Sequence, residues 1–354
     1  RVRPGLCGQL AKTLHRSIET SPCSVPYWDG ELYQEAFRGS LTRYGTLKYK
    51  NRRAELGLRR VEWLEAAADS ARRYWSDHFQ PRFETLWKDL LTLQAYPILA
   101  GEAPSDLLIQ ADARFDRLAG ELQALEGDIL DRLLTRDDEF CWSVFNSGSF
   151  TRRGMVNIPL RHGMESGFWT DEGGQPLAAA LGESSWTVVV DEVPSLGWTS
   201  IYFVPGTTAK EESPFTLHGR GIDTPYYRLR WNERGQWTKF VDIAGGRDLL
   251  GGGRGNVFQV FDDTPASGSN RDLDPVAVAD MQEVTELVET EVAEHNALRC
   301  VLRFHWRWQN STIKQDLIVY NHNRRIDLRT HLDWRQPRQF LKVAFATNIR
   351  AQQA

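Results

Sequence analysis

The sequence predicts a multidomain chain in which helices come first and a large antiparallel β-sandwich follows. From Thr42 to Leu134 the apolar residues recur every three or four positions, which is the period of one face of a helix. After Asp137 and Asp138 the period drops to two and turn residues become frequent, which is typical of antiparallel strands. The chain has 354 residues, of which 41% are apolar, so it can bury a sizeable core in two domains or more.

Residues 1–40 show neither period. Pro22, Pro26, Gly30 and Gly39 interrupt the pattern at short intervals, which favours irregular structure. We therefore expect this stretch to be the edge of a domain.

Residues 41–136 are expected to form three helices. The first runs to about Tyr74, the second carries Phe83 and Leu90, and the third follows Pro104. The third is the clearest, because its apolar residues form one continuous seam: Leu108, Ala111, Phe115, Leu118, Leu122 and Leu125. Three such helices would pack as an antiparallel bundle.

Residues 137–354 are expected to be β-structure. Between Ile326 and Trp334 apolar and charged residues alternate, so one face of a strand is apolar and the other charged. The same alternation holds from Leu298 to Trp308, and turn residues at 321–323 separate two later strands. Such strands form an antiparallel sheet that is buried on one side. Most of the many tryptophans are expected to be core residues.

The composition excludes several classes of protein. A net charge of -4 gives no electrostatic reason to bind nucleic acid or an anionic membrane surface. No apolar run approaches the roughly 18 residues of a membrane-spanning helix. Cys7, Cys23, Cys141 and Cys300 have no paired spacing, so we expect reduced thiols in a cytoplasmic protein. The chain starts at Arg1 and not at Met, and we expect it to be a fragment.

Other patterns do not suggest catalysis. The eight histidines are scattered and predict no metal site. Asp262 and Asp263 are expected in a solvated turn, and the glycines from Gly251 to Gly255 in a hairpin, because strand-like residues follow them.

Several motifs resemble the α-mannosidases of glycoside hydrolase family 38. The C-terminal part contains STIKQDLIVY, RRIDLRTHLDW and FLKVAFATNIRA, which are similar to strands of the family's sandwich. Residues 27–56, YWDGELYQEAFRGSLTRYGTLKYKNRRAEL, resemble the family's entry into its bundle, and residues 145–159, FNSGSFTRRGMVNIP, resemble its entry into the sandwich. The likeness is collinear over nearly the whole chain.

This resemblance implies a domain organisation. Residues 1–40 would be a remnant of the edge of the catalytic domain, and residues 41–136 the three-helix bundle of the α-mannosidase middle domain. Residues 137–354 would be a galactose-mutarotase-like supersandwich, truncated at its C-terminus. The family's sandwich continues beyond the strand that matches Phe340 to Ile349, so we expect an uncovered sheet edge and self-association.

The resemblance also implies a zinc-dependent, retaining glycosidase whose metal ligands are His and Asp side chains. Most of those ligands lie in an N-terminal α/β domain that nothing here resembles. One further ligand, the His of NQFHDILPG, matches Tyr96 in LQAYPILAG, residues 93–101. A phenol with a pKa near 10 is a poor zinc ligand, so we expect no metal on this chain. An ordinary packed aromatic is the reading favoured for Tyr96.

Other family site positions are also changed. Leu41, three residues after Arg38, replaces the Tyr of the family's GTYTS motif. The sandwich loop PLAYDAWDID matches residues 265–274, PASGSNRDLD, which keep Asp272 and Asp274 but lose the aromatic residues. The resemblance thus leaves Arg38, Tyr96, Asp272 and Asp274 as substrate-facing remnants and no catalytic residue.

Two functions remain open. In the first, the chain would be part of an α-mannosidase-like hydrolase that acts on mannose-containing glycans, and it would be inactive by itself. Alternatively, it comes from a non-catalytic carbohydrate-binding or assembly relative with a degenerate site. An intact HxD pair and nucleophile upstream of Arg1 would favour the enzyme.

Overall fold

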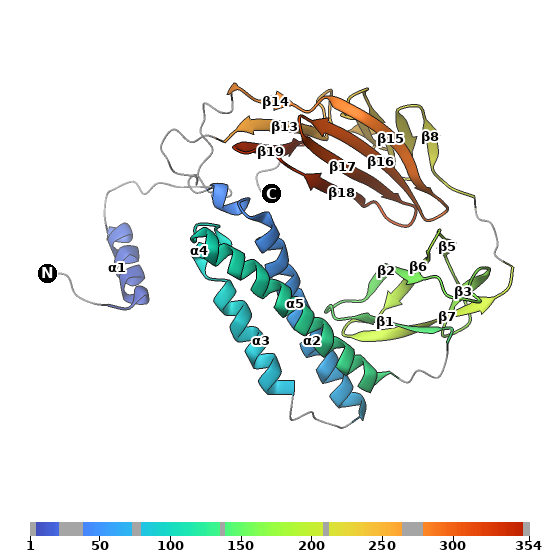
Figure 1. The fold of residues 1–354 in the computed structure, drawn as a ribbon, viewed down its shortest axis with the longest axis horizontal. Coiled ribbons are helices and arrows are strands. Elements are labelled where there is room, and N and C mark those ends of the chain that lie inside the picture. Colours follow the sequence, from blue (N-terminus) through green and yellow to red (C-terminus); the bar gives the residue numbers. More distant parts are fainter. Residues whose placement is uncertain are drawn as a thin grey trace. The chain divides into compact units, whose positions relative to one another are not determined.

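The computed structural model describes residues 5–20, 38–72, 79–134, 139–207, 212–263 and 279–349. They divide into two compact units. One unit contains helix α1 (Cys7–Thr20), none of whose side chains is buried. The other unit, Ala36–Asn348, contains every other described helix and strand, with the helices first and the strands after them (Figure 1). The predicted order of helices and antiparallel sheets is confirmed.

The described helices of the larger unit are three long ones and two short ones. The long helices are α2 (Gly45–Arg72), α3 (Phe79–Leu93) and α5 (Ser105–Leu133). The 3₁₀ helix η1 (Arg38–Leu41) precedes α2, and α4 (Tyr96–Leu99) lies between α3 and α5. The pattern predicted the three long helices but neither short one. No described helix is long and apolar enough to cross a membrane.

The three long helices share one hydrophobic core. All six residues of the apolar seam predicted for α5 are buried, and Ile129 extends the seam by one turn. They pack with buried residues of α2 and α3, among them Leu58, Val61, Leu86 and Leu90. Ion pairs on the outside also link α2 to α5, such as Lys50 with Asp112 at 2.6 Å. The seam therefore holds the three helices together.

The first part of the β-structure consists of two small antiparallel sheets. One has the order β1-β7-β3-β4 and the other β2-β6-β5. A tryptophan-rich core lies between them and contains Trp169, Trp186 and Phe203. The strands are β1 (Cys141–Asn146), β2 (Arg152–Pro159), β3 (Gly167–Asp171), β4 (Pro176–Leu177), β5 (Ala179–Leu181), β6 (Ser185–Val193) and β7 (Gly197–Pro205).

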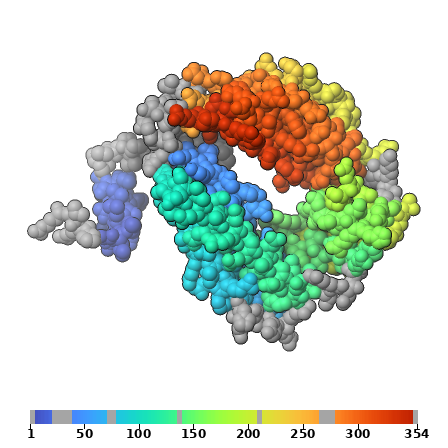
Figure 2. Space-filling model, viewed as in Figure 1, coloured from blue at the N-terminus to red at the C-terminus, as the bar shows by residue number. Residues whose placement is uncertain are grey.

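The second part consists of three antiparallel sheets around another core. Their strand orders are β12-β11-β10-β9-β8, β14-β13-β19 and β15-β16-β17-β18. The core contains Trp231, Trp237, Phe304 and Trp306. The strands are β8 (Thr216–His218), β9 (Gly221–Asp223), β10 (Tyr227–Trp231), β11 (Trp237–Asp242), β12 (Arg247–Asp248), β13 (Val257–Asp262), β14 (Gln282–Glu283), β15 (Glu286–His295), β16 (Arg299–Trp308), β17 (Ser311–Tyr320), β18 (Ile326–Asp333) and β19 (Gln339–Ala344). In Figure 2 the C-terminal strands, coloured orange to red, form one continuous surface.

The strand predictions hold best in the middle of a sheet. In β16 the predicted inward residues Cys300, Leu302, Phe304 and Trp306 are all buried. In β18 the predicted apolar face is only half-buried, and Leu332 is 47% exposed, because β18 is the last strand of its sheet. Most of the tryptophans singled out in the sequence are buried or half-buried, but Trp198 is 42% exposed. The last strand, β19, ends at Ala344 and not at Ile349.

Candidate functional site

Tyr96 lies at the start of α4, in the turn between α3 and α5. Ala95 is the N-cap of this short helix, and Pro97 stands in its first turn, where the missing N–H costs nothing. The side chain of Tyr96 is 60% exposed, and its hydroxyl lies 3.5 Å from Oε1 of Glu102. The prediction that Tyr96 is a packed aromatic is therefore wrong. Its neighbours form a single short turn, which leaves the ring at the surface.

The turn with Tyr96 is tied to the start of α2. Nζ of Lys48 donates hydrogen bonds to the carbonyl oxygens of Arg43 and Leu99. Burial, together with the nearby charge of Arg43, lowers the pKa of Lys48. Gly101 has a φ of +70°, and a Cβ added there would lie 2.6 Å from Cδ2 of Tyr44. Only glycine fits this close approach without strain.

Two of the segments predicted to face the substrate are thus neighbours. Leu41 in η1 is 62% exposed, as is typical of a surface position, and it lies just before the residues that contact α4. The backbone of Arg38 belongs to η1, but its side chain lies outside the described residues. Asp272 and Asp274 also lie outside them. The structure therefore brings together the segments of Leu41 and Tyr96.

Other residues of the same motifs have a structural role that the sequence did not reveal. Nε2 of Gln94 donates to Oδ1 of Asn51 at 3.1 Å and to Oε1 of Glu55 at 2.9 Å. Nδ2 of Asn51 donates to the same carboxylate at 3.1 Å. This network joins the end of α3 to α2. Part of the motif likeness therefore reflects packing of the helices.

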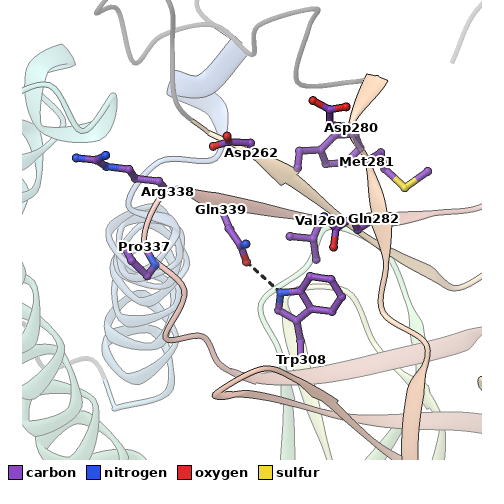
Figure 3. Close-up of a pocket in the computed structure, with 10 residues that line it drawn as sticks. Val260, Asp262, Asp280, Met281, Gln282, Trp308, Pro337, Arg338 and Gln339 are labelled. Atoms are coloured by element: carbon purple, nitrogen blue, oxygen red, sulfur yellow. Dashed lines mark hydrogen bonds between the residues drawn. The ribbon is translucent and has the colours of Figure 1, made fainter.

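A cavity of about 570 Å³ opens at one end of the sheet β14-β13-β19 (Figure 3). Sequence reasoning did not predict it, because it is assembled from segments far apart in the chain. Those segments are the end of β13, the start of β14, the end of β16 and the start of β19. The lining residues are Val260, Phe261, Asp262, Asp280, Met281, Gln282, Trp308, Pro337, Arg338 and Gln339.

The cavity combines an indole with fixed amide groups. Nε1 of Trp308 donates to Oε1 of Gln339 at 3.0 Å, as Figure 3 shows. Gln339 pairs with Asp262 across β13 and β19, and Gln282 pairs with Val260 across β13 and β14. The polar side chains are thus placed by the register of a small sheet.

The rim of the cavity carries charge. Asp262, Asp280 and Arg338 are all exposed. The backbone N–H of Asp263 donates to the carbonyl oxygen of Arg338 at 2.8 Å, and Arg338 has a φ of +56°. A positive φ is uncommon for arginine and persists where the surroundings hold it. Asp262 is the last residue of β13 and Asp263 follows it, so only Asp263 lies outside the strand; both are exposed, and Asp262 in addition lines the cavity.

Comparison with known proteins relates the C-terminal part of the chain to a family. Residues 222–354 match the "Glycosyl hydrolases family 38 C-terminal domain". This part of the chain is therefore similar to the C-terminal domain of glycoside hydrolase family 38. The match takes in the sheets that form the cavity and ends with the chain, so the predicted resemblance is confirmed.

Longer alignments relate nearly the whole chain to α-mannosidases. It is 22% identical over 382 residues to "Alpha-mannosidase G" of Dictyostelium discoideum, an alignment that covers 96% of this chain and 34% of that protein. It is 22% identical over 358 residues to "Alpha-mannosidase 2C1" of Homo sapiens, covering 97% of this chain and 32% of that protein. The chain therefore spans about a third of the length of these curated relatives.

A solved structure has a similar fold. The crystal structure of an alpha-mannosidase from Enterococcus faecalis V583 superposes with a TM-score of 0.68, covering 87% of this chain and 43% of that chain. The sequence identity is 13%, so this likeness concerns the fold alone.

The residues at the expected zinc position do not fit the metal. Tyr96 offers a phenol in place of an imidazole, and Pro97 has no side-chain donor. Within the described ranges no group of three or more His, Cys, Asp or Glu residues could hold a metal ion. We therefore assign no zinc-dependent step to this chain.

Proposed function

We propose that this chain is part of an α-mannosidase-like glycoside hydrolase acting on α-mannosides, and that it does not catalyse the reaction alone. The observation that carries the proposal is the alignment with α-mannosidases over 96% of the chain, helices and sheets together. A match confined to the sandwich would support a shared domain only, since one fold hosts many functions. The substrate is then a mannose-containing glycan.

The finer architecture forms part of the proposal. Helices α2, α3 and α5 are the three-helix bundle of the middle domain, residues 41–136, which their single shared core supports. The sheets of residues 137–354 are the galactose-mutarotase-like supersandwich, and residues 1–40 are the edge of the catalytic domain. We also propose a cytoplasmic location, which is supported by the described cysteines, Cys7, Cys141 and Cys300, all being free thiols.

In this proposal the reaction proceeds with retention, and its nucleophile, acid and zinc ion come from residues outside this chain. A zinc ion held by those residues would bind the hydroxyls of the sugar. The role of this chain is to bind and orient the substrate. Arg38, Tyr96, Asp272 and Asp274 are proposed to face it, and the exposure of Tyr96 supports a side chain that is free to contact a ligand.

The test is an assay on nitrophenyl α-mannoside with added zinc, using nitrophenyl β-mannoside as the control substrate. The 354-residue chain should release no nitrophenol above the buffer rate. The natural protein, expressed with any sequence its gene encodes before Arg1, should hydrolyse the α-mannoside only. Hydrolysis by the chain alone would contradict its proposed inactivity. One bound zinc ion per chain would contradict the proposal that the metal is held by residues outside this chain.

A second function is favoured by one specific observation. Tyr96, Pro97 and Leu41 together replace three site residues of the family, and the location of the ends of the chain does not explain these changes. They favour a non-catalytic carbohydrate-binding relative. An inactive natural protein that still binds mannosides would support this alternative.

A further inference from the structure

The cavity at the end of the sheet β14-β13-β19 has the size and the two-sided lining that a sugar ring requires. Small-molecule sites range from about 300 to 1,000 Å³, and this cavity, at about 570 Å³, lies inside that range. A pyranose ring has an apolar face of C–H groups and an equator of hydroxyls. It is bound best where an apolar wall and a few fixed polar groups converge.

The apolar wall comes from the end of β16 and from β13. Trp308 is half-buried and packs against the core of the C-terminal sheets, so its indole is held in place. Val260 is buried beside it, and Met281 and Pro337 complete the apolar lining. In Figure 3 the side chains of Trp308, Val260 and Gln339 converge.

The hydrogen bond between Trp308 and Gln339 decides which atoms Gln339 can offer to a ligand. Its Oε1 accepts the indole N–H, which orients the amide. Its Nε2 carries two N–H donors, and no hydrogen bond among the described residues uses either of them. Gln282, placed opposite Val260 in β14, adds a second amide. Amides can donate to and accept from the hydroxyls of one sugar.

The site is also pre-organised. Nε1 of Trp334 lies 3.4 Å from the carbonyl oxygen of Gln339, and the backbone bond from Asp263 holds Arg338. Both contacts fix the start of β19 before any ligand arrives, which lowers the entropy cost of binding. Among the described lining residues, two carboxylates, those of Asp262 and Asp280, accompany one guanidinium, that of Arg338. This charge favours a neutral sugar over a phosphorylated one.

We propose that this cavity is a pyranoside-binding subsite, with Trp308 as the platform and Gln339 as the orienting donor. The identity of the ligand rests on the proposed function: as part of an α-mannosidase-like protein, the subsite takes a mannopyranosyl residue.

The experiment measures binding of methyl α-mannopyranoside to the 354-residue chain by saturation-transfer NMR and calorimetry. The key variant is Gln339→Glu, which keeps an acceptor for Trp308 but removes both N–H donors. It should weaken binding about tenfold or more, which corresponds to about 1.4 kcal/mol. The control is Gln110→Glu, which makes the same change of charge at an exposed position of α5 and should leave binding unchanged.

A second variant keeps the test decisive if Gln339→Glu fails to fold. Gln282 is exposed on its strand, so Gln282→Ala should preserve the fold and weaken binding severalfold. Binding unaffected by both folded variants, or no binding to the parent chain, overturns the subsite. Equal binding of methyl α-glucopyranoside overturns the mannose assignment. None of these results decides the hydrolase proposal, which the nitrophenyl mannoside assay tests separately.

Discussion

Leu118 in the middle of α5 gives the sharpest test of how the helices pack. Its side chain is only 3% exposed and belongs to the core shared by α2, α3 and α5. Leu118→Ala removes buried apolar atoms and leaves a cavity, which costs about 2 to 5 kcal/mol depending on how far the site collapses. Collapse is limited here, because α2 and α5 are already close: a Cβ added to Gly57 would lie 3.1 Å from Cδ1 of Leu122. We therefore expect the upper half of this range.

The assay is urea denaturation followed by far-ultraviolet circular dichroism. Two controls lie on the same helix. Leu107→Ala makes the identical substitution at a side chain that is 47% exposed, and Gln123→Ala changes an exposed polar residue. Each should alter the free energy of unfolding by less than about 1 kcal/mol. If all three variants lost similar stability, α5 would not bury the face assigned to it, and the packing argument would be refuted.

Four further predictions concern the turn at α4, two titrating groups and the last strand. Gly101→Ala should destabilise the chain by about 1 to 3 kcal/mol through its positive φ, whereas Gly120→Ala, where a Cβ meets nothing within 4 Å, should not destabilise it in the same urea titration. Burial raises the pKa of Cys300 to about 12, so iodoacetamide at neutral pH should label the exposed Cys7 and spare Cys300 until the chain unfolds; equal labelling would contradict this. Burial and a nearby guanidinium lower the pKa of His322 from 6.5. The unfolded chain therefore takes up a proton that the folded chain does not, and the stability of the fold should decrease as the pH drops below about 6.5. His322→Asn should flatten this pH dependence of stability, and an unchanged slope would contradict the role of His322. Strand β19 is the last strand of its sheet, and an exposed edge strand can pair with another chain. Light scattering should therefore show self-association as the concentration rises, and a monomer at every concentration would contradict the prediction of an open sheet edge.

The helices were predictable because their pattern depends on local sequence. The seam on α5 has a single period over several turns, and burial follows it residue by residue. Central strands were equally predictable, as β16 shows with Cys300, Leu302 and Phe304 all buried. The inward face of such a strand follows the alternation in its own sequence, whereas the other face does not fully, since Val301 is buried as well.

Edge strands and the site were less predictable, for physical reasons. The exposure of Leu332 depends on β18 having a neighbour on one side only, which no alternation encodes. Tyr96 is exposed because α4 is a single short turn, and the sequence alone gave no reason to separate it from the helices around it. The cavity depends on Trp308 meeting Gln339 across the sheets, a contact between positions 31 residues apart. In the sequence alone, Trp308 has the pattern of a core residue and Gln339 that of a residue at the end of a strand.

Proton NMR of nitrophenyl α-mannoside during its hydrolysis tests the proposed hydrolase function directly. The protein used is the natural one, which includes this chain and any sequence encoded before it. We expect the α-anomer of mannose to appear first and to equilibrate later with the β-anomer, because the proposed mechanism retains configuration. Appearance of the β-anomer first would contradict retention. No release of mannose at all, under conditions where the protein is folded and supplied with zinc, would contradict the assignment to an α-mannosidase-like hydrolase.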